Sequence, residues 1–523
     1  MERQFLERGL ERSAAARDAE IVVLNTCTVT EGADKDARSS IRRLQRVNPD
    51  CRILVTGCYA QRAPEELAAL PGVTWVVGNS HKHRAAEIAT SSSTGFVSLA
   101  QLSGERPSAA KAVHENDPAV AALMRCATQE QEHGQSFSRA DEARLPGDQN
   151  ALVVVGDIFA HTELLAAPVF EAANERTRPN LKVQDGCDNR CAFCVIPYVR
   201  GQSRSLPMQR VIAEVRTLVE AGYREVVISG INLGRWGRDL VGGRRSLVVG
   251  EQSPSISSMS CSSERPESNG ERPTTNDRRL VGLIHRILTQ TSLEKLRISS
   301  VEPMDWSDEL IGLVASSSRI AKHAHVPMQS GSDAVLRRMH RKYRPWHYRE
   351  KILKIRAAMP TAAIGADVMV GFPGETEAEF DETRRMIEAL PFTYLHVFTY
   401  SARPGTPAAG HPRQVPVNLA RERNRVLREM ASAKKAAFMR SLVRTTVEAI
   451  TLHAGGAEFT EGLTENYLKV KISGHHEANQ WMDVNIEGVD GEMLLGELAT
   501  PGLASCTRGG RGDCGVYGSE QVH

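Results

Sequence analysis

The sequence predicts an α/β protein with an N-terminal parallel α/β domain, a central partial (β/α)6 barrel and a small C-terminal β-barrel. Strand-like apolar runs alternate with helical segments between residues 20 and 403, a pattern typical of parallel sheets. Short strands separated by polar turns follow in residues 445–498, as in small β-barrels. The length of 523 residues allows three to four domains of about 150 residues each.

The composition is that of an ordinary globular chain, with 41% hydrophobic and 24% charged residues. Lys and Arg number 65 against 63 Asp and Glu, for a net charge of +2. This balance excludes a strongly basic coat but allows a local basic face. We expect no membrane-spanning helix, because no apolar run approaches 18 residues, and no secretion signal. We therefore expect a cytoplasmic enzyme or binding protein.

Residues 1–90 are predicted to form the N-terminal domain. The chain starts with a charged helical segment, and the remaining elements are strands at 20–27, 52–58 and 74–77 and helices at 36–47 and 65–70. Cys27 and Cys58 each fall where a strand ends. Since ligands of parallel sheets bind outside the carboxyl ends of the strands, these two cysteines are expected to share one crevice.

Two stretches and the tail lack this alternation. Residues 91–150 are rich in Ser, Ala, Gln and Glu, and residues 242–277 are rich in Ser, Pro and Glu. We expect a partly disordered linker or insertion at the first and a disordered insertion at the second, and a Gly-rich tail over residues 499–523. The cysteines in these parts are expected to be incidental thiols or weak ligand candidates: Cys126, Cys261, Cys506 and Cys514.

Residues 151–440 are predicted to form the central domain. Six strand-like runs lie at 181–185, 225–230, 295–300, 321–326, 362–370 and 394–400. In the helix predicted at 208–221, apolar residues share one face. Six consecutive β/α units favour a partial barrel with its site at the carboxyl ends of the strands. Periodicity alone leaves an ordinary doubly wound sheet open.

A basic helix at 421–444 precedes the five short strands of the last domain, residues 441–498. These strands are TVEAITLH, EFTEGLTEN, YLKVKISG, WMDVNIEGV and EMLLGEL. Their regular spacing predicts the small barrel.

The most informative motif is a loop with the spacing Cys-x3-Cys-x2-Cys, formed by Cys187, Cys191 and Cys194 directly after the first barrel strand. Three thiolates on one loop suit iron or zinc. A structural zinc site normally takes a fourth ligand from a second Cys or His pair, and no such pair lies nearby. The loop fits better a [4Fe–4S] cluster with one iron left open. Three structural cysteines or a zinc site remain the alternative.

The loop and its surroundings resemble a known family. Cys-x3-Cys-x2-Cys at the mouth of a β/α barrel is similar to the radical S-adenosylmethionine superfamily. The string VQDGCDNRCAFCVIPYVRGQSRS, with NTCTVT and VTGCYAQ upstream, resembles the methylthiotransferases. Asp188-Asn189-Arg190 makes it most similar to those that act on threonylcarbamoyladenosine in tRNA. The resemblance covers most of residues 1–90 and 152–498.

The resemblance implies a role for each matching segment. Cys187, Cys191 and Cys194 would bind the radical cluster, whose open iron would chelate the amino and carboxylate groups of S-adenosylmethionine. Its reductive cleavage yields a deoxyadenosyl radical, chemistry that belongs to the cofactor. The segments that would line the cofactor at the next strand ends are Gly230-Ile231-Asn232, Ser300, Glu302, Gln329-Ser330-Gly331, Asp367 and Gly371-Phe372-Pro373-Gly374. Taken singly, such segments are also typical of plain turns.

Cys27 and Cys58 match two of the three cysteines that hold a second [4Fe–4S] cluster in this family, a cluster thought to carry or donate the sulfur. The family places the third cysteine on an earlier strand, and this sequence opens at Met1 within the following helix. Cys51 is a poor substitute, because the strand between it and Cys58 spans roughly 23 Å. We expect a truncated or misassigned start or, alternatively, a labile two-cysteine site.

Basic residues near the motif are candidate RNA contacts. Arg200, Arg204 and Arg210 flank the cysteine loop, and Arg337, Arg338, Arg341, Lys342 and Arg344 form a positive run. From these we choose Arg200, Arg204, Arg338 and Lys342 as RNA-binding residues, although a solvated surface is the better explanation of such runs when they are taken alone. The last domain, with Thr464-Glu465-Asn466-Tyr467, resembles the TRAM domain, a small RNA-binding barrel. Recognition of unpaired loop bases would suit an anticodon loop.

The resemblance therefore implies an enzyme with two clusters that adds a methylthio group at C2 of N6-threonylcarbamoyladenosine, next to the anticodon. One S-adenosylmethionine would supply the methyl group and another the radical. We expect a monomer served by an electron donor such as flavodoxin or ferredoxin. The alternatives are a methylthiotransferase for isopentenyladenosine tRNA or for a ribosomal protein, a form that cleaves S-adenosylmethionine without inserting sulfur, and a non-enzymatic RNA-binding protein.

Overall fold

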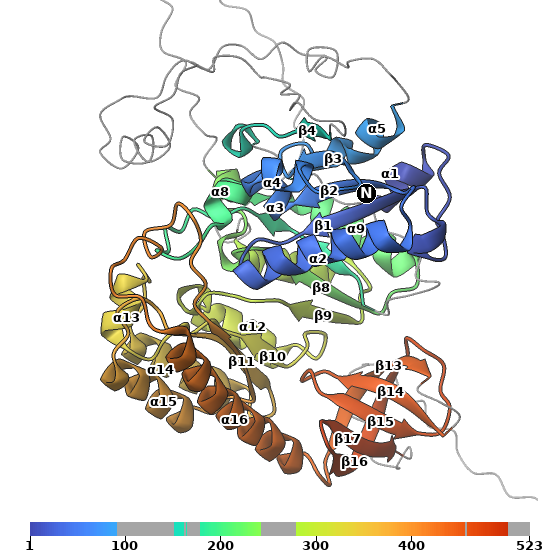
Figure 1. Ribbon diagram of the computed structural model, residues 1–523. Helices are drawn as coiled ribbons and strands as arrows, with labels where there is room; N and C mark the ends of the chain where they lie inside the picture. The colour runs from blue at the N-terminus through green and yellow to red at the C-terminus, as the bar shows by residue number, and fades with distance from the viewer. Residues whose placement is uncertain (92–150, 162–163, 165–177, 242–278, 455–457, 500–523) are drawn as a thin grey trace, which may run out of the picture. The chain divides into compact units, whose positions relative to one another are not determined.

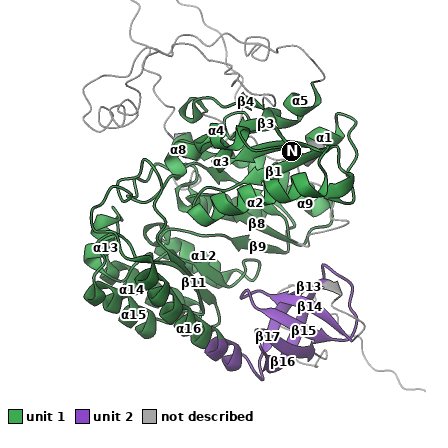
Figure 2. Cartoon of the chain, in the orientation of Figure 1, with its two compact units in different colours: residues 1–435 green, residues 436–523 purple. Residues whose placement is uncertain are grey.

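The computed structural model describes residues 1–91, 151–161, 164, 178–241, 279–454 and 458–499. The chain forms two compact units, Met1–Lys435 and Ala436–His523 (Figure 2). The predicted α/β class and the small C-terminal barrel are confirmed. The expected insertions and tail, with Cys126, Cys261, Cys506 and Cys514, lie outside the described residues. None of the described helices combines the length and the apolar character needed to cross a membrane.

The N-terminal sheet has four parallel strands in chain order, β1 (Ile21–Thr26), β2 (Arg52–Gly57), β3 (Val73–Gly78) and β4 (Leu152–Val154) (Figure 1). The first three confirm the predicted strands. The fourth pairs with β3, so residues 152–154 lie in the N-terminal sheet and not beyond the boundary expected at residue 151. The helices of this part are α1 (Glu2–Leu6), α2 (Glu31–Val47), α3 (Cys58–Arg62), α4 (Pro64–Ala68) and α5 (Ala85–Thr90).

Local sequence explains where these elements begin. Helix α2 starts at Glu31 rather than residue 36, because the Thr30 hydroxyl accepts a hydrogen bond from the Ala33 amide and caps it. Strand β2 is buried along its length except at Arg52, as expected for an apolar run in a parallel sheet. Its pairing with β1 aligns Thr26 with Gly57. Cys27 and Cys58 therefore follow neighbouring strands at the same edge, as predicted.

The central part is a partial barrel of six parallel strands. Strands β5 (Asn180–Lys182), β8 (Glu225–Ser229) and β9 (Lys295–Ile298) form one sheet, and β10 (His323–His325), β11 (Ala363–Val370) and β12 (Tyr394–Thr399) form another. A parallel bridge between Leu296 and Ile320 links the two sheets. The six strands follow chain order without the reversal of a doubly wound sheet, so the barrel prediction is confirmed.

Helices cover the barrel (Figure 1). They are α8 (Ile196–Arg200), α9 (Met208–Glu220), α10 (Arg238–Val241), α11 (Leu280–Gln290), α12 (Asp308–Ser316), α13 (Asp333–Arg338), α14 (Pro345–Ala358), α15 (Glu377–Ala389) and α16 (Val417–Ser441). The face of α9 that the sequence marks as apolar is buried in the barrel core. A short hairpin of β6 (Gln184–Asp185) and β7 (Arg204–Ser205) flanks the cysteine loop.

The N-terminal sheet packs directly on the barrel within the first unit. Cys58 at the start of α3 lies in an apolar cluster with Val195 and Val199 of the α8 region. The Asn79 side chain donates a 2.9 Å hydrogen bond to the Val199 carbonyl. A buried ion pair joins Asp34 of α2 to Arg403, which follows β12. These contacts bring the edge with Cys27 and Cys58 to the barrel.

The second unit is a closed barrel with the strand order β13-β14-β15-β17-β16. Its strands are β13 (Thr446–Ala454), β14 (Phe459–Thr464), β15 (Lys469–Ser473), β16 (Trp481–Asp490) and β17 (Met493–Leu498). Asn466 is buried and bonds the Thr464 hydroxyl in the turn after β14. The turn leaves the Tyr467 side chain exposed.

Candidate active site

The loop between β6 and α8 carries Cys187, Cys191 and Cys194. Gly186 opens it with φ +70°, and a Cβ there would overlap the Gln202 carbonyl oxygen. Only glycine adopts this conformation without strain and fits so close to another backbone. The sequence therefore needs Gly186 to turn the first cysteine into the barrel mouth.

Hydrogen-bond donors face each of the three thiols. The Asn189 amide and the Asn232 side-chain nitrogen lie 3.4 and 3.8 Å from Cys187 Sγ. Arg341 Nη1 lies 3.3 Å from Cys191 Sγ, and the Ile196 amide donates to Cys194. Such donors stabilise thiolate sulfur in iron–sulfur sites.

The thiols need a cation to become thiolates together. Burial raises the pKa of Cys194 to about 12 and also raises the pKa of Cys187, and the neighbouring thiols add to both shifts. Iron supplies the missing positive charge. Within the described residues no three His, Cys, Asp or Glu side chains converge on a single ion. A [4Fe–4S] cluster with an open iron takes one thiolate on each of three irons, and three thiols on one loop fit this arrangement.

Gln184 organises this loop, although the sequence analysis did not single it out. Its fully buried side chain donates to the carbonyls of Asp185 and Gly186 at 3.0 and 2.8 Å and to Ser203 Oγ at 3.0 Å. Its Oε1 accepts from the Asn232 amide at 2.8 Å. The only signal in the sequence is a polar glutamine in the strand-like run 181–185, just before the cysteine motif.

Arg341 connects the loop to the third strand end. It forms an ion pair with Glu302 and also donates to Cys191 Sγ. Its guanidinium lies 5.0 Å from the ring of buried Tyr343. Arg341 belongs to the positive run expected on an RNA-binding surface, yet it is buried and serves the cysteine loop.

The structure brings some of the expected cofactor residues to the thiols. Asn232 contacts Cys187, and Glu302 reaches Cys191 through Arg341. Gly230 lies so close to Gln184 that a Cβ would stand 2.7 Å from its Oε1. Ser300 follows β9 two residues after its end. Gln329 follows β10 with φ +63° and a buried Oε1 that has no partner among the described residues, a strained conformation typical of functional sites.

Two other expected cofactor residues have different surroundings. A Cβ on Gly331 would stand 2.7 Å from Thr383 Cα of α15, so this glycine allows close packing. Asp367 Oδ1 lies 3.4 Å from His325 Nε2. Neither residue has a described contact with a thiol. The cofactor roles of Gly331 and Asp367, like those of the other residues chosen for the cofactor, stay predictions.

Three of the four chosen RNA-binding residues have partners inside the protein. Arg200 donates to Cys58 Sγ at 3.2 Å and lies 3.4 Å from Asp185. Arg204 is buried and bonds the Arg200 carbonyl, and Arg338 pairs with Glu379 at 2.8 Å. These three guanidinium groups are engaged in contacts within the fold. Lys342 alone of the four is exposed.

Cys58 and Cys27 differ in exposure. Cys58 is buried, with Arg200 Nε at 3.2 Å and Asn79 Nδ2 at 3.5 Å from its sulfur. Cys27 is exposed. Gly57 precedes Cys58 with φ +105°, and a Cβ there would overlap the Thr26 carbonyl oxygen. The strand ends therefore pack as closely as glycine permits.

The described residues supply two of the three thiols that the resemblance implies for a second cluster. Cys51 is buried in the N-terminal core next to Arg52, which pairs with Ile21 at the opposite edge of the sheet. Cys51 is therefore a poor ligand, as predicted. The described cysteines do not complete a three-thiolate site here, so we derive no step through a second cluster.

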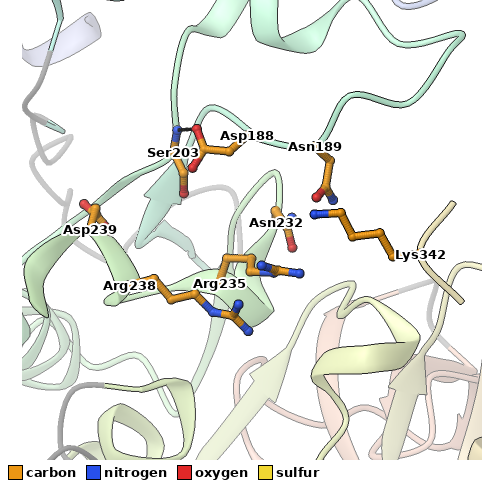
Figure 3. Close-up of a pocket in the computed structure, with 8 residues that line it drawn as sticks. All are labelled: Asp188, Asn189, Ser203, Asn232, Arg235, Arg238, Asp239 and Lys342. Atoms are coloured by element: carbon orange, nitrogen blue, oxygen red, sulfur yellow. Dashed lines mark hydrogen bonds between the residues drawn. The ribbon is translucent and has the colours of Figure 1, made fainter. Parts of the chain in front are cut away.

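A pocket of about 300 Å³ opens beside the cysteine loop (Figure 3). The residues that line it are Asp188, Asn189, Ser203, Asn232, Arg235, Arg238, Asp239 and Lys342. Asp188 and Asn189 come from the cysteine loop itself, and Arg235 and Arg238 follow the second barrel strand. A pocket with charged and amide side chains beside the cysteine loop is where a reactant would meet the cofactor.

Comparisons with known proteins agree with this geometry. The Radical SAM superfamily matches residues 181–387, and the family described as Uncharacterized protein family UPF0004 matches residues 1–78. The chain is 34% identical over 475 residues to the threonylcarbamoyladenosine tRNA methylthiotransferase MtaB of Bacillus subtilis, covering 90% of this chain and 86% of that protein. The MtaB of Aquifex aeolicus is 30% identical, with 93% and 95% covered.

A second group of relatives has a different name. The tRNA-2-methylthio-N(6)-dimethylallyladenosine synthase of Erythrobacter litoralis is 30% identical over 86% of this chain and 82% of its own length. Both groups are methylthiotransferases, and enzymes of this superfamily use a [4Fe–4S] cluster with S-adenosylmethionine. The thiols of Cys187, Cys191 and Cys194 fit that cluster. The chain therefore belongs to the methylthiotransferase family of radical S-adenosylmethionine enzymes.

Proposed function

We propose that this enzyme adds a methylthio group at C2 of N6-threonylcarbamoyladenosine next to the anticodon of tRNA. The observation that carries the proposal is the cysteine loop with a pocket of charged and amide side chains against it, in a chain 34% identical to an enzyme named for this reaction. The net change replaces the C2 hydrogen of the base with a methylthio group.

The chain's own residues have distinct parts in this proposal. Cys187, Cys191 and Cys194 would hold the cluster, which when bound supplies the electron that cleaves S-adenosylmethionine. Gln184 fixes the loop through the carbonyls of Asp185 and Gly186. Asn232, held by Gln184, offers a buried oxygen without a described partner to an N–H or O–H donor of a reactant.

The alternative substrate is dimethylallyladenosine, known also as isopentenyladenosine. Its N6 group is apolar, whereas five of the eight residues that line the pocket are charged. An apolar N6 group placed here would take water from these charged side chains without giving them a hydrogen-bond partner, which is unfavourable. The pocket therefore supports the threonylcarbamoyl substrate. No described feature favours a ribosomal protein.

The wider setting is part of the proposal. The second unit, with exposed Tyr467, would contact the RNA, and exposed Lys342 would add a phosphate contact. We propose a cytoplasmic monomer that receives electrons from a flavodoxin or a ferredoxin.

Nucleoside mass spectrometry tests this function. Anaerobically reconstituted protein, a reductant and S-adenosylmethionine are combined with tRNA that carries threonylcarbamoyladenosine or dimethylallyladenosine. We expect the methylthio product on the first tRNA only. A product on the second alone, or none on either with the cluster fully occupied, would contradict the proposal.

A further inference from the structure

Three cations gather in the pocket beside the cysteine loop. Figure 3 shows the Arg235 guanidinium and the Lys342 ammonium directed to the same space as the amides of Asn189 and Asn232. Arg238 lies next to Arg235 on the following turn. Among the described residues Lys342 forms no ion pair, so its charge is available to a ligand.

The acidic residues of the pocket are bonded elsewhere. Asp188 accepts the Ser203 amide at 3.0 Å. Asp239 accepts the Ser205 amide at 2.8 Å and the Ser205 hydroxyl at 2.6 Å, and Figure 3 shows it turned away from the two arginines. These carboxylates are held by their own hydrogen bonds and leave the cations to face the open space.

A buried carboxylate outside the pocket lies beside both arginines and accepts a hydrogen bond from Arg238. Asp305, with 4% of its side chain exposed, lies 3.4 Å from Arg235 Nε and 2.8 Å from Arg238 Nη2. Arg235 contacts Asp305 through Nε, and no described residue bonds its two Nη groups. The Arg235 guanidinium is attracted to Asp305 by charge and makes no described hydrogen bond to it, so its donors are open to a ligand. A guanidinium can bind a planar carboxylate with two parallel hydrogen bonds.

The pocket also offers an acceptor. Asn232 has 5% of its surface exposed, and its Oδ1 has no hydrogen-bond partner among the described residues. Its Nδ2 is directed to Cys187 Sγ. A ligand here would combine a carboxylate for the cations with an N–H or O–H donor for Asn232.

We propose that Arg235, Arg238 and Lys342 bind the free carboxylate of the threonylcarbamoyl group on the substrate adenosine. This inference rests on the proposed function and names the residues that read its substrate. In S-adenosylmethionine the carboxylate chelates the open iron, as the family resemblance implies, so a second carboxylate comes from the other reactant. The threonylcarbamoyl group carries a carboxylate, a hydroxyl and N–H donors, whereas a dimethylallyl group carries none of these.

The test compares two tRNAs that differ only in this carboxylate. One carries threonylcarbamoyladenosine, and in the other its carboxylate has been converted to an amide. The proteins are the wild type, Arg235→Gln, Arg235→Lys and Arg385→Gln. Arg385 is a matched control, an arginine of α15 that pairs with Asp381 at an exposed position. Each protein is first assayed for iron content and for cleavage of S-adenosylmethionine without RNA.

We expect the wild type to favour the acid over the amide by about tenfold or more in kcat/KM. Arg235→Gln should remove this preference by slowing the acid alone, Arg235→Lys should restore part of it, and Arg385→Gln should leave it unchanged. Iron content and RNA-free cleavage should stay at wild-type levels.

Three outcomes would overturn the inference. Equal slowing on both tRNAs would show a phosphate contact, because phosphates are the same in both. A raised KM for S-adenosylmethionine in the RNA-free assay would assign the pocket to the cofactor. If Arg235→Gln still prefers the acid over the amide as the wild type does, Arg235 does not bind the carboxylate. If the wild type cleaves S-adenosylmethionine but methylthiolates neither tRNA, the proposed function itself fails.

Discussion

Cys187, Cys191 and Cys194 share one loop of the barrel, whereas Cys27 and Cys58 end two neighbouring strands of the N-terminal sheet. In both places a glycine with positive φ stands before a cysteine and packs too closely for a side chain. The loop brings its thiols together through local spacing. The strand ends bring theirs together through sheet register and through contacts with the barrel.

This difference predicts how each site fails. The loop has a hydrogen-bond donor at each thiol, supplied by neighbouring residues and by Arg341. The strand-end pair depends on groups from far along the chain, namely Arg200 at Cys58 and Arg403 at Asp34. Changes in the loop should therefore act on cofactor cleavage. Changes at the interface should act on stability and on the steps that need Cys27 and Cys58.

The largest effect is expected for Cys191→Ala. Loss of one of three thiolates leaves the cluster without a stable site, so iron content and cleavage of S-adenosylmethionine should fall to background. Deoxyadenosine measured by liquid chromatography gives the readout. Cys51→Ala is the matched control, because Cys51 is buried at the far edge of the sheet, and it should keep cleavage. Cleavage of S-adenosylmethionine by Cys191→Ala near the wild-type rate would contradict the claim that the loop thiols hold the cluster.

Arg403→Gln should have the next largest effect. It leaves the Asp34 carboxylate buried without its partner from the barrel, a loss that costs about 3–5 kcal/mol. Arg62 remains 3.0 Å from Asp34, so the loss in the free energy of unfolding should lie near the lower end of that range. Denaturant unfolding measures it. The exposed change Arg425→Gln serves as the control, and an equal loss in both variants would contradict the prediction.

The paired changes Gly57→Ala and Gly186→Ala sharpen the comparison. Each forces a left-handed residue at about 1–2 kcal/mol and overlaps a carbonyl oxygen. Gly186→Ala should reduce cleavage of S-adenosylmethionine, because it displaces Cys187. Gly57→Ala should spare cleavage and reduce methylthio product, because it separates Cys58 from Cys27. The two variants are assayed for both products, and the same pattern in both would refute the distinction.

The smallest effect is expected for Arg200→Gln. It removes the shared donor of Cys58 and Asp185 and should lower the free energy of unfolding by about 1 kcal/mol, because the arginine is partly exposed. Thermal unfolding of the anaerobic protein measures the loss. Arg200→Lys keeps the positive charge but loses the several donors of the guanidinium, so it should recover part of the lost stability. A weakened affinity for tRNA with unchanged stability would restore the RNA-binding role expected from the sequence.

Apolar periodicity predicted the sheet, the six barrel strands and the small barrel, because each element buries its own pattern of residues. The spacing of Cys187, Cys191 and Cys194 identified the loop for the same local reason. The β4 strand was missed, since it follows a long irregular stretch and has three residues. Gln184 was missed because a single polar residue in a strand does not reveal which backbone groups it will bond. The partners of Arg200, Arg204 and Arg338 were missed because side-chain contacts made by folding leave no local signal.

The central claim is that the loop thiols support cofactor cleavage without Cys27 and Cys58. The family resemblance implies in addition that sulfur insertion needs the strand-end thiols, and this role stays a prediction. The direct measurement is the ratio of methylthio product to deoxyadenosine, compared between the wild type and Cys58→Ala. The two proteins are matched for the iron bound at the cysteine loop. We predict that Cys58→Ala keeps forming deoxyadenosine while the methylthio product falls to background. A wild-type ratio in Cys58→Ala, or loss of both products together, would contradict it.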